Sequence, residues 1–204
     1  MTLWEVDIYP TSGQPDLLVR RIAAEAADLG LAEKLAIAAA RGFLIQGELD
    51  NGQVTQLASD LLANEVVQRT VVAPVGSEQL NEPPGDQQRL VHVLPKPGVM
   101  DPVAQSALAA IADFGIQVEA VRTFTKYWLG DLSDEQLERL CSKVLANDAV
   151  EQVVVGPLRL DRLYVGSPYE LELATVPLRE LDDERLIRLS REGQLYLSLE
   201  EMRT

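Results

Sequence analysis

Alternating apolar and polar residues open the chain, with the two-residue period of a strand that has one buried face. Trp4, Val6 and Ile8 alternate with polar neighbours, and the same alternation returns at Val91 and Val93. We therefore expect a strand at the start of each half of the chain.

A helical pattern with cap residues follows each of these strands. Asp16 stands at the N-cap position of the first helix, which Gly30 ends. In the second half, Asp101-Pro102 opens the helix with proline at its first position, and Gly115 ends it. The apolar residues that recur on one face of these helices are Leu18, Ile22 and Leu29, then Ala104, Leu108 and Ile111.

Two short apolar segments come next in each half, and we interpret each segment as a separate strand. They cover residues 35–39 and 43–45, and then residues 118–124 and 127–129. A second helix follows, with apolar residues at the i, i+3, i+4, i+7 spacing. Its apolar positions are Val54, Leu57, Ala58, Leu61 and Leu62 in the first half, and Leu137, Leu140, Cys141, Val144 and Leu145 in the second. Ser133 and Gln136 form a capping box, and final strands are expected at residues 70–72 and 153–155.

The sequence also repeats itself. Residues 62–67 read LANEVV, and residues 145–150 repeat this pattern as LANDAV. The offset is 85 near the start of each half (95 − 10, for Pro10 and Pro95) and 83 near its end (147 − 64, for Asn64 and Asn147). A loop deletion of two residues in one copy would leave this drift, so we expect a duplicated unit.

The predicted order is strand, helix, strand, strand, helix, strand, which is the ferredoxin-like arrangement. We therefore expect an α+β fold of two tandem ferredoxin-like βαββαβ units. The sheet of each unit has a bare second face, and two copies could cover these faces or join their sheet edges as a pseudo-dimer.

We expect four segments along the chain. Residues 1–75 form the first unit, and residues 76–88, with Pro83-Pro84-Gly85, form a linker. Residues 89–165 form the second unit. Residues 166–204 form a tail with a short amphipathic helix at residues 181–192, and Ser198 with Glu201 announces another helix just before Thr204. We expect this tail to be the beginning of a region that continues in a longer protein.

Composition and charge narrow the class of protein. The 204 residues have a formal net charge of −14, which argues against nucleic acid as a partner because such binding depends on Lys and Arg. The chain has no apolar run of the roughly 18 residues that a membrane span needs, and its first residues do not resemble a secretory signal. A cytoplasmic protein without a membrane partner is therefore expected.

The search for catalytic chemistry is mostly negative. His92 is the only histidine, so a zinc site or a Ser-His-Asp arrangement cannot be completed, and we expect this residue to be exposed or at a sheet edge. Cys141 lies on a buried helical stripe and is expected to be a core residue. Glycine-rich phosphate loops are missing. We expect no catalytic, cofactor-binding or metal-binding residue.

Lys126, Tyr127 and Trp128 place a cation beside two aromatic side chains, a combination that is common at protein interfaces. Trp128 belongs either to such a contact surface or to the core. Arg122 would lie on the same strand face as Lys126 if the strand were continuous.

The second half resembles a known family, the PurS subunit of phosphoribosylformylglycinamidine synthase. The resemblance rests on residues 96–102 (KPGVMDP), 121–122 (VR), 126–127 (KY) and 143–151 (KVLANDAVE). The first half departs from it, with Thr11 in place of Lys96 and Pro15-Asp16 in place of Asp101-Pro102. Family members are usually single-copy chains that dimerise, so the tandem resembles a fused dimer. Residues 193–202 also resemble the start of the synthetase region of such enzymes.

The resemblance implies an accessory role in purine biosynthesis. PurS-like domains join a glutaminase to an ATP-dependent synthetase and help ammonia pass between them; the synthetase, not this chain, would bind ATP and magnesium. On family resemblance and charge type, Lys96, Arg122 and Lys126 are the expected partner-contact residues. One alternative is an ACT-like regulatory module that binds an amino acid. A small acylphosphatase-type enzyme is disfavoured because residues 10–15 contain no arginine to hold phosphate.

Overall fold

The computed structural model describes residues 1–11, 13–32, 34–163, 176 and 178–203, and the chain divides into two compact units, Met1–Gly166 and Ser167–Thr204. The strands of the first unit are β1 (Thr2–Pro10), β2 (Ile37–Gly47), β3 (Gln68–Pro74), β4 (Arg89–Pro95), β5 (Ala120–Leu129) and β6 (Glu151–Val155). Its α-helices are α1 (Leu17–Asp28), α2 (Asn51–Leu57), α3 (Pro102–Asp113) and α4 (Asp134–Leu140). Short helical turns follow α2 (η1, Ala58–Leu62), β3 (η2, Glu78–Asn81) and α4 (η3, Cys141–Leu145). No helix of the described residues is long and apolar enough to cross a membrane.

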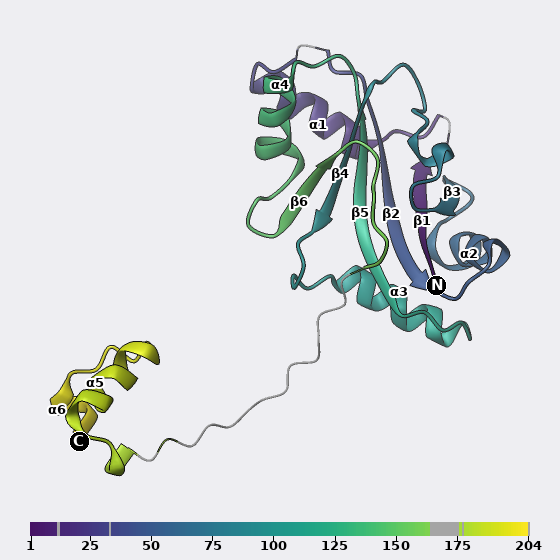
Figure 1. Cartoon of the computed structure of the whole chain (residues 1–204). Helices are drawn as coiled ribbons and strands as arrows, with labels where there is room; N and C mark the ends of the chain where they lie inside the picture. Colours follow the sequence, from purple (N-terminus) through teal and green to yellow (C-terminus); the bar gives the residue numbers. More distant parts are fainter. Residues whose placement is uncertain (12, 33, 164–175, 177, 204) are drawn as a thin grey trace. The chain divides into compact units, whose positions relative to one another are not determined.

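All six strands form one antiparallel sheet in the order β3-β1-β2-β5-β4-β6 (Figure 1). The two halves of the chain meet where β2 pairs with β5, from Ile37 opposite Leu129 to Gln46 opposite Ala120. The expected α+β class is confirmed, and the halves are joined through their sheet edges.

The expectation of four strands in each half is wrong. Residues 37–47 form one strand, and so do residues 120–129, so each half has the order strand, helix, strand, helix, strand. The apolar runs are interrupted at Arg41-Gly42 and at Thr125-Lys126. These interruptions led to the prediction of two short strands instead of one long strand. Both pairs lie within continuous strands, near the centre of the β2–β5 ladder, with Arg41 opposite Thr125 and Gly42 opposite Phe124.

Helices α1 to α4 pack on one face of the sheet in two cores, and each core contains residues from both halves. In the first core, Ile22 and Ala26 of α1 pack with Val91 and Val93 of β4 and with α4. In the second core, residues of α3 pack with β1, β2 and α2; these α3 residues are Ala104, Ala107 and Ile111. The first helix of each half thus contributes to a core that contains strand residues of the other half.

The other face of the sheet is also covered, contrary to the expected bare face. Leu158 and Leu163, which follow β6, are buried with Leu44 and Phe124 on this face. The segment between β3 and β4 adds η2, where Leu80 is buried and Gln79 donates a hydrogen bond from Nε2 to the Val72 carbonyl. These covering segments leave little of the central sheet open to water.

The helix ends follow the local signals in the sequence. Asp16 and Asp101 accept hydrogen bonds from backbone N–H groups of the first helical turn, and Gly30 and Gly115 adopt positive φ angles of 65° and 87° after the helices. The Ser133–Gln136 capping box is present. Cys141 is buried, as expected of a core residue.

The second unit contains α5 (Asp183–Glu192) and α6 (Leu199–Arg203). Asp182 caps α5 and Gly193 follows it, which confirms the helix expected in this region. The hydroxyl of Ser198 and the carboxylate of Glu201 form the hydrogen bonds of the expected cap before α6.

Candidate functional site

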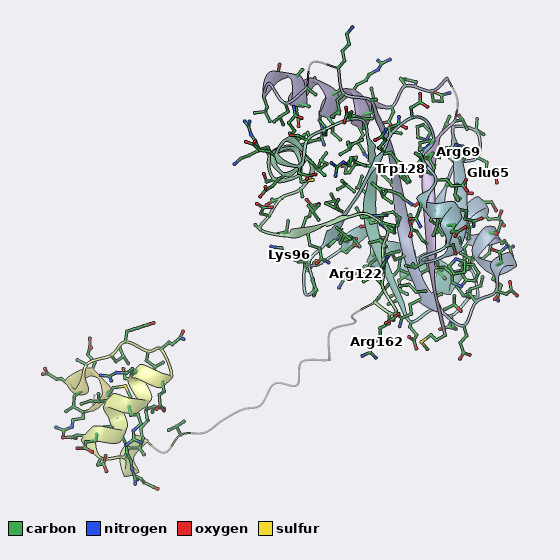
Figure 2. The ribbon with its side chains drawn as sticks, turned by 45° about the horizontal axis from the view of Figure 1, so that its top comes forward. Glu65, Arg69, Lys96, Arg122, Trp128 and Arg162 are labelled. Atoms are coloured by element: carbon green, nitrogen blue, oxygen red, sulfur yellow. The ribbon has the colours of Figure 1, made fainter. Side chains whose placement is uncertain are left out.

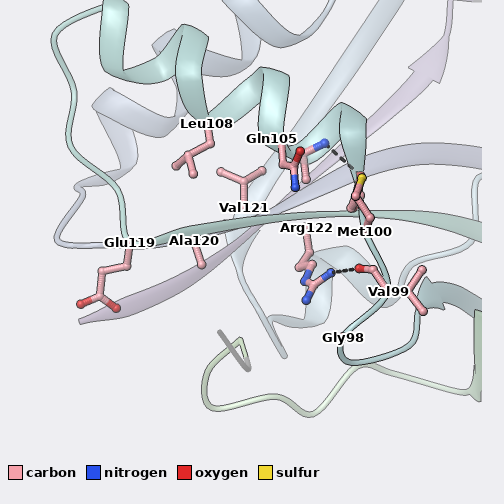
Figure 3. A pocket seen from close by; sticks show the side chains of 11 residues that line it. Gly98, Val99, Met100, Gln105, Leu108, Glu119, Ala120, Val121 and Arg122 are labelled. Atoms are coloured by element: carbon pink, nitrogen blue, oxygen red, sulfur yellow. Dashed lines mark hydrogen bonds between the residues drawn. The ribbon is translucent and has the colours of Figure 1, made fainter. Parts of the chain in front are cut away.

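A groove of about 380 Å³ runs between α3 and β5 in the second half of the chain (Figure 3). Its apolar lining includes Val99, Met100, Leu108 and Val121. Arg122 and Met100 lie toward one end, and Glu119 lies at the other (Figure 3). The groove combines an apolar floor with one cation, Arg122, and two carboxylates, Asp101 and Glu119.

The buried carboxylate of Asp101 fixes the loop that forms one end of this groove. Its Oδ1 accepts a hydrogen bond from the N–H of Ala104 at 2.9 Å, and its Oδ2 accepts from Thr123 N and Oγ1 at 2.8 and 2.9 Å. The same side chain therefore caps α3 and ties the loop to β5. The groove wall is preorganised because one residue makes both connections.

Arg122 lies between this groove and a second, smaller cavity. Its Nη1 donates a hydrogen bond to the Val99 carbonyl at 3.1 Å, and no ion pair joins it to a carboxylate among the described residues. The second cavity, of about 140 Å³, is lined by Arg122 and Arg162 with Gln152 and five apolar or proline residues. Two guanidinium groups thus line a cavity that no carboxylate lines, and guanidinium pairs well with carboxylate.

Lys96 completes this group of cations. It lies between Pro95 and Pro97, which both line the smaller cavity, and its ammonium donates to the Asp148 carbonyl. Figure 2 shows Lys96, Arg122 and Arg162 toward the same end of the sheet, away from Trp128 and Arg69. We call Lys96, Arg122 and Arg162 the cationic cluster.

The first half lacks these cations at the corresponding positions. Thr11 replaces Lys96 at the offset of 85, and Ala39 replaces Arg122 at the offset of 83 (122 − 39). Arg162 follows β6, outside the repeated sequence, so the search for repeated or motif residues missed it. The sequence showed only that Arg162 comes shortly after the last expected strand.

Lys126 does not lie on the surface, so its expected role as a surface cation is wrong. The side chain is 0% exposed, and Nζ lies 2.8 Å from Glu5 Oε1 and 2.7 Å from Asp7 Oδ2. Because β5 is continuous, Arg122 and Lys126 share a sheet face as expected, but the covering segments enclose Lys126. Trp128 is also buried, so it belongs to the core, and its Nε1 donates to the Tyr9 hydroxyl at 3.4 Å.

His92 is buried as well, contrary to the expected exposed or edge position. Its Nδ1 lies 3.1 Å from the carbonyl oxygen of Gly156, and its Nε2 lies 3.8 Å from Glu5 Oε1. The segment after β6 supplies the Gly156 contact and covers the ring. Glu5, Asp7, His92 and Lys126 together form a buried ionic cluster on the face opposite the helices.

Burial and charge act in opposite directions on the two acids of the buried ionic cluster. Burial raises the pKa of Asp7 to about 7, and the attraction of Lys126 only partly offsets this. Burial alone would raise the pKa of Glu5, but the nearby His92 ring, the hydrogen bond from Lys126 and the Lys126 charge outweigh it and lower the pKa. The cluster therefore favours a proton on Asp7 and a charge on Glu5.

The Asp7→Asn variant should reveal this proton, because removing the carboxyl group changes how the free energy of unfolding depends on pH. The folded pKa of Asp7, about 7, is above its ordinary value of 3.8, so stability from the bound proton is present at low pH and lost as the pH rises through 7. From pH 5 to 7, wild type should lose about 1 kcal/mol per pH unit relative to Asp7→Asn. Urea unfolding of both proteins at pH 5, 6, 7 and 8 measures the difference, and parallel pH profiles would contradict the assignment.

The side chains of the described residues are better suited to binding than to catalysis. No group of three or more His, Cys, Asp or Glu side chains among them could hold a metal ion. Burial raises the pKa of the Cys141 thiol to about 11, which keeps it protonated and a poor nucleophile near neutral pH. His92 and Lys126 are enclosed and do not line the groove.

One comparison with known proteins gives a match. A family model described as PurS, phosphoribosylformylglycinamidine (FGAM) synthase, matches residues 88–156. No curated protein matches the chain. The matched residues include β4, α3, β5 and β6 and therefore Lys96, Arg122 and the whole α3 groove.

Proposed function

We propose that this chain is an accessory part of FGAM synthase in purine biosynthesis, because residues 88–156 match the PurS family model. It joins the glutaminase to the ATP-dependent synthetase and supports the transfer of ammonia between them. The observation that carries the proposal is the family match over the residues that form the α3 groove.

The groove supports a binding role. Its wall is fixed by Asp101, its floor is apolar, and Arg122 has hydrogen-bonding capacity beyond its bond to Val99. Arg122, one of the expected contact residues, lines the groove, and Lys96, another, lies between two prolines that line the smaller cavity. In an acidic chain, a local group of cations favours a partner surface of opposite charge.

The two halves act, in this proposal, as a fused dimer. The β2–β5 ladder is centred between Arg41 and Gly42 on one strand and between Phe124 and Thr125 on the other. These positions correspond at the offset of 83 (124 − 41), as a two-fold axis through the ladder requires. Covalent connection would keep both halves at high effective concentration.

The chemistry of the complex is assigned to the partners. The synthetase holds ATP and magnesium, and the glutaminase releases ammonia. Ammonia must remain unprotonated to act as a nucleophile, so an interface that excludes water would reduce its loss. The role of this chain is to hold the two partners against each other.

Reconstitution tests the proposal. The chain is mixed with a glutaminase subunit and a synthetase that lacks its own PurS-like domain, with glutamine, ADP and magnesium present, and the mixture is separated by size-exclusion chromatography with light scattering. We expect one co-eluting complex and, with ATP and formylglycinamide ribonucleotide, glutamine-dependent activity that is absent without the chain.

Two outcomes would contradict this result. A chain that elutes alone with both partners present would remove the accessory role. A rise in melting temperature with a free amino acid, without any subunit binding, would favour an ACT-like regulatory module instead.

A further inference from the structure

The exposed face of α3 carries no charge until its last residue. Its exposed positions are Pro102, Val103, Gln105, Ser106, Ala109, Ala112 and Asp113. In this chain 25% of the residues are charged, and the water-facing side of a helix is normally where charges gather. The composition of this face is closer to the centre of a protein interface, where charged residues are depleted.

Helix α1 provides a comparison within the same molecule. At the offset of 85, Arg20 and Arg21 replace Gln105 and Ser106, and Glu25 replaces Ala110. Arg21 and Glu25 form an ion pair at 3.7 Å on the exposed side of α1. Both helices expose an apolar residue near the start, Leu17 in α1, but only α3 has an uncharged face along its length.

The uncharged face continues into the α3 groove. Met100 is 72% exposed and Val103 is 58% exposed, so both present large apolar side chains to water beside the groove. Exposed apolar groups that adjoin a groove mark interaction sites more often than scattered ones do. We call Met100, Val103, Gln105, Ala109 and the groove lining the α3 surface.

The charges around the α3 surface specify the chemistry of what could cover it. Arg122 lies at the Met100 end, and Arg162 lines the smaller cavity with it. The Asp101 carboxylate also lies at this end, but both of its oxygens accept hydrogen bonds from Ala104 and Thr123. Glu119, at the other end of the groove, is engaged with Gln46, whose Nε2 donates to Oε2 at 2.6 Å. An apolar segment that carries a carboxylate would match this pattern if the carboxylate met the two arginines.

We propose that the α3 surface docks one segment of a partner subunit, apolar along the groove and acidic at the end that faces Arg122 and Arg162. The inference rests on the proposed function and names the surface through which it operates. The first half has a groove of about 350 Å³ between α1 and β2, lined by Leu17 and Arg41. Its helix α1 is charged and Ala39 stands in place of Arg122, so this groove lacks the uncharged helix face and the pair of arginines.

The same substitution at two corresponding alanines tests the surface. Ala109→Glu places a bulky negative side chain on α3, and Ala24→Glu places it at the matching exposed position of α1. Glutamate is a good helix former, so both variants should keep the melting temperature of wild type. We expect the Kd for the synthetase–glutaminase pair to rise at least about tenfold for Ala109→Glu and to stay within about twofold for Ala24→Glu.

A second pair of variants tests the expected carboxylate. Arg122→Gln combined with Arg162→Gln should weaken binding at least about tenfold and flatten the dependence of Kd on salt. Arg20→Gln on α1 removes a cation that lies outside the α3 surface. It should leave the Kd and its dependence on salt unchanged. Loss of affinity with an unchanged salt dependence would contradict the acidic segment.

The outcomes separate the two proposals. If wild type forms the complex and Ala109→Glu binds as tightly as Ala24→Glu, the α3 surface is overturned while the accessory role stands. If wild type forms no complex, the accessory role is overturned and the docking segment with it. A wild-type chain that elutes as a dimer, which Ala109→Glu converts to a monomer, would assign the surface to a second copy and overturn the proposal.

Discussion

Replacing Lys126 with alanine is expected to lower the free energy of unfolding by about 3 to 5 kcal/mol, the usual loss when one partner of a buried ion pair is removed. The ammonium lies between Glu5 and Asp7 at 2.8 and 2.7 Å, and the side chain is inaccessible to water. Its removal leaves two carboxyl groups in the interior without a cation. Because both then resist ionisation, the loss should be larger at pH 8 than at pH 5. Urea unfolding at the two pH values measures it.

Two further variants separate charge from packing in this experiment. Lys143→Ala removes an exposed lysine from the same half and should change stability by less than about 0.5 kcal/mol. Lys126→Met with Glu5→Gln and Asp7→Asn removes all three ionisable groups and keeps most of the volume, so it should recover a large part of the loss. If Lys126→Ala is as harmless as Lys143→Ala, the buried ion pairs do not exist in solution.

Gly42→Ala is expected to destabilise the protein by about 3 kcal/mol, at the upper end for overpacking in a core. A Cβ atom at this position would lie 2.3 Å from Phe124 Cζ and 2.4 Å from the carbonyl oxygen of Val6. The phenyl ring could move, but the carbonyl belongs to the neighbouring strand β1 and cannot yield without disturbing the ladder. Thermal and urea unfolding of the variant measure the effect.

Gly47→Ala is the control because it lies in the same strand. Its added Cβ would have its closest contact at 3.4 Å, from Val118 Cα, which is ordinary van der Waals contact. Its effect should stay within about 1 kcal/mol. Adding Phe124→Leu to Gly42→Ala should restore only part of the stability, because the Val6 carbonyl remains; full restoration would show that the ring alone required the glycine.

Features that depend on a few neighbouring residues could be predicted from the sequence. Asp16, Asp101 and Ser133 cap helices because their side chains reach N–H groups two or three residues later. The final strands and the helical stripes were predicted for the same reason. Arg122 could be placed on a strand, on the same face as Lys126, although its relation to Arg162 depends on the path of the chain after β6.

Features that depend on distant residues could not be predicted. Lys126 was expected to contact a partner because the sequence does not show that its acid partners, Glu5 and Asp7 in the first strand, lie next to it in the fold. The burial of His92 could not be predicted for the same reason, because it depends on the segment around Gly156, which is far from His92 in the sequence. Arg41-Gly42 resembles a turn in the sequence. The periodicity of nearby residues does not show that this glycine is needed because strand β1 and Phe124 approach it closely.

Because each core contains residues of both halves, the first half cannot complete its packing until the second half has been synthesised. The apolar side of α1, with Ile22 and Ala26, leaves the ribosome well before β4 and α4, against which it packs. Until Val91 and Val93 have been made, that side can pack only against first-half residues such as Leu31 and Ala39, and the apolar surface left exposed favours aggregation of the nascent first half. Contacts between residues so far apart also slow folding. The fused arrangement thus makes the first half dependent, during translation, on residues that the ribosome has not yet added.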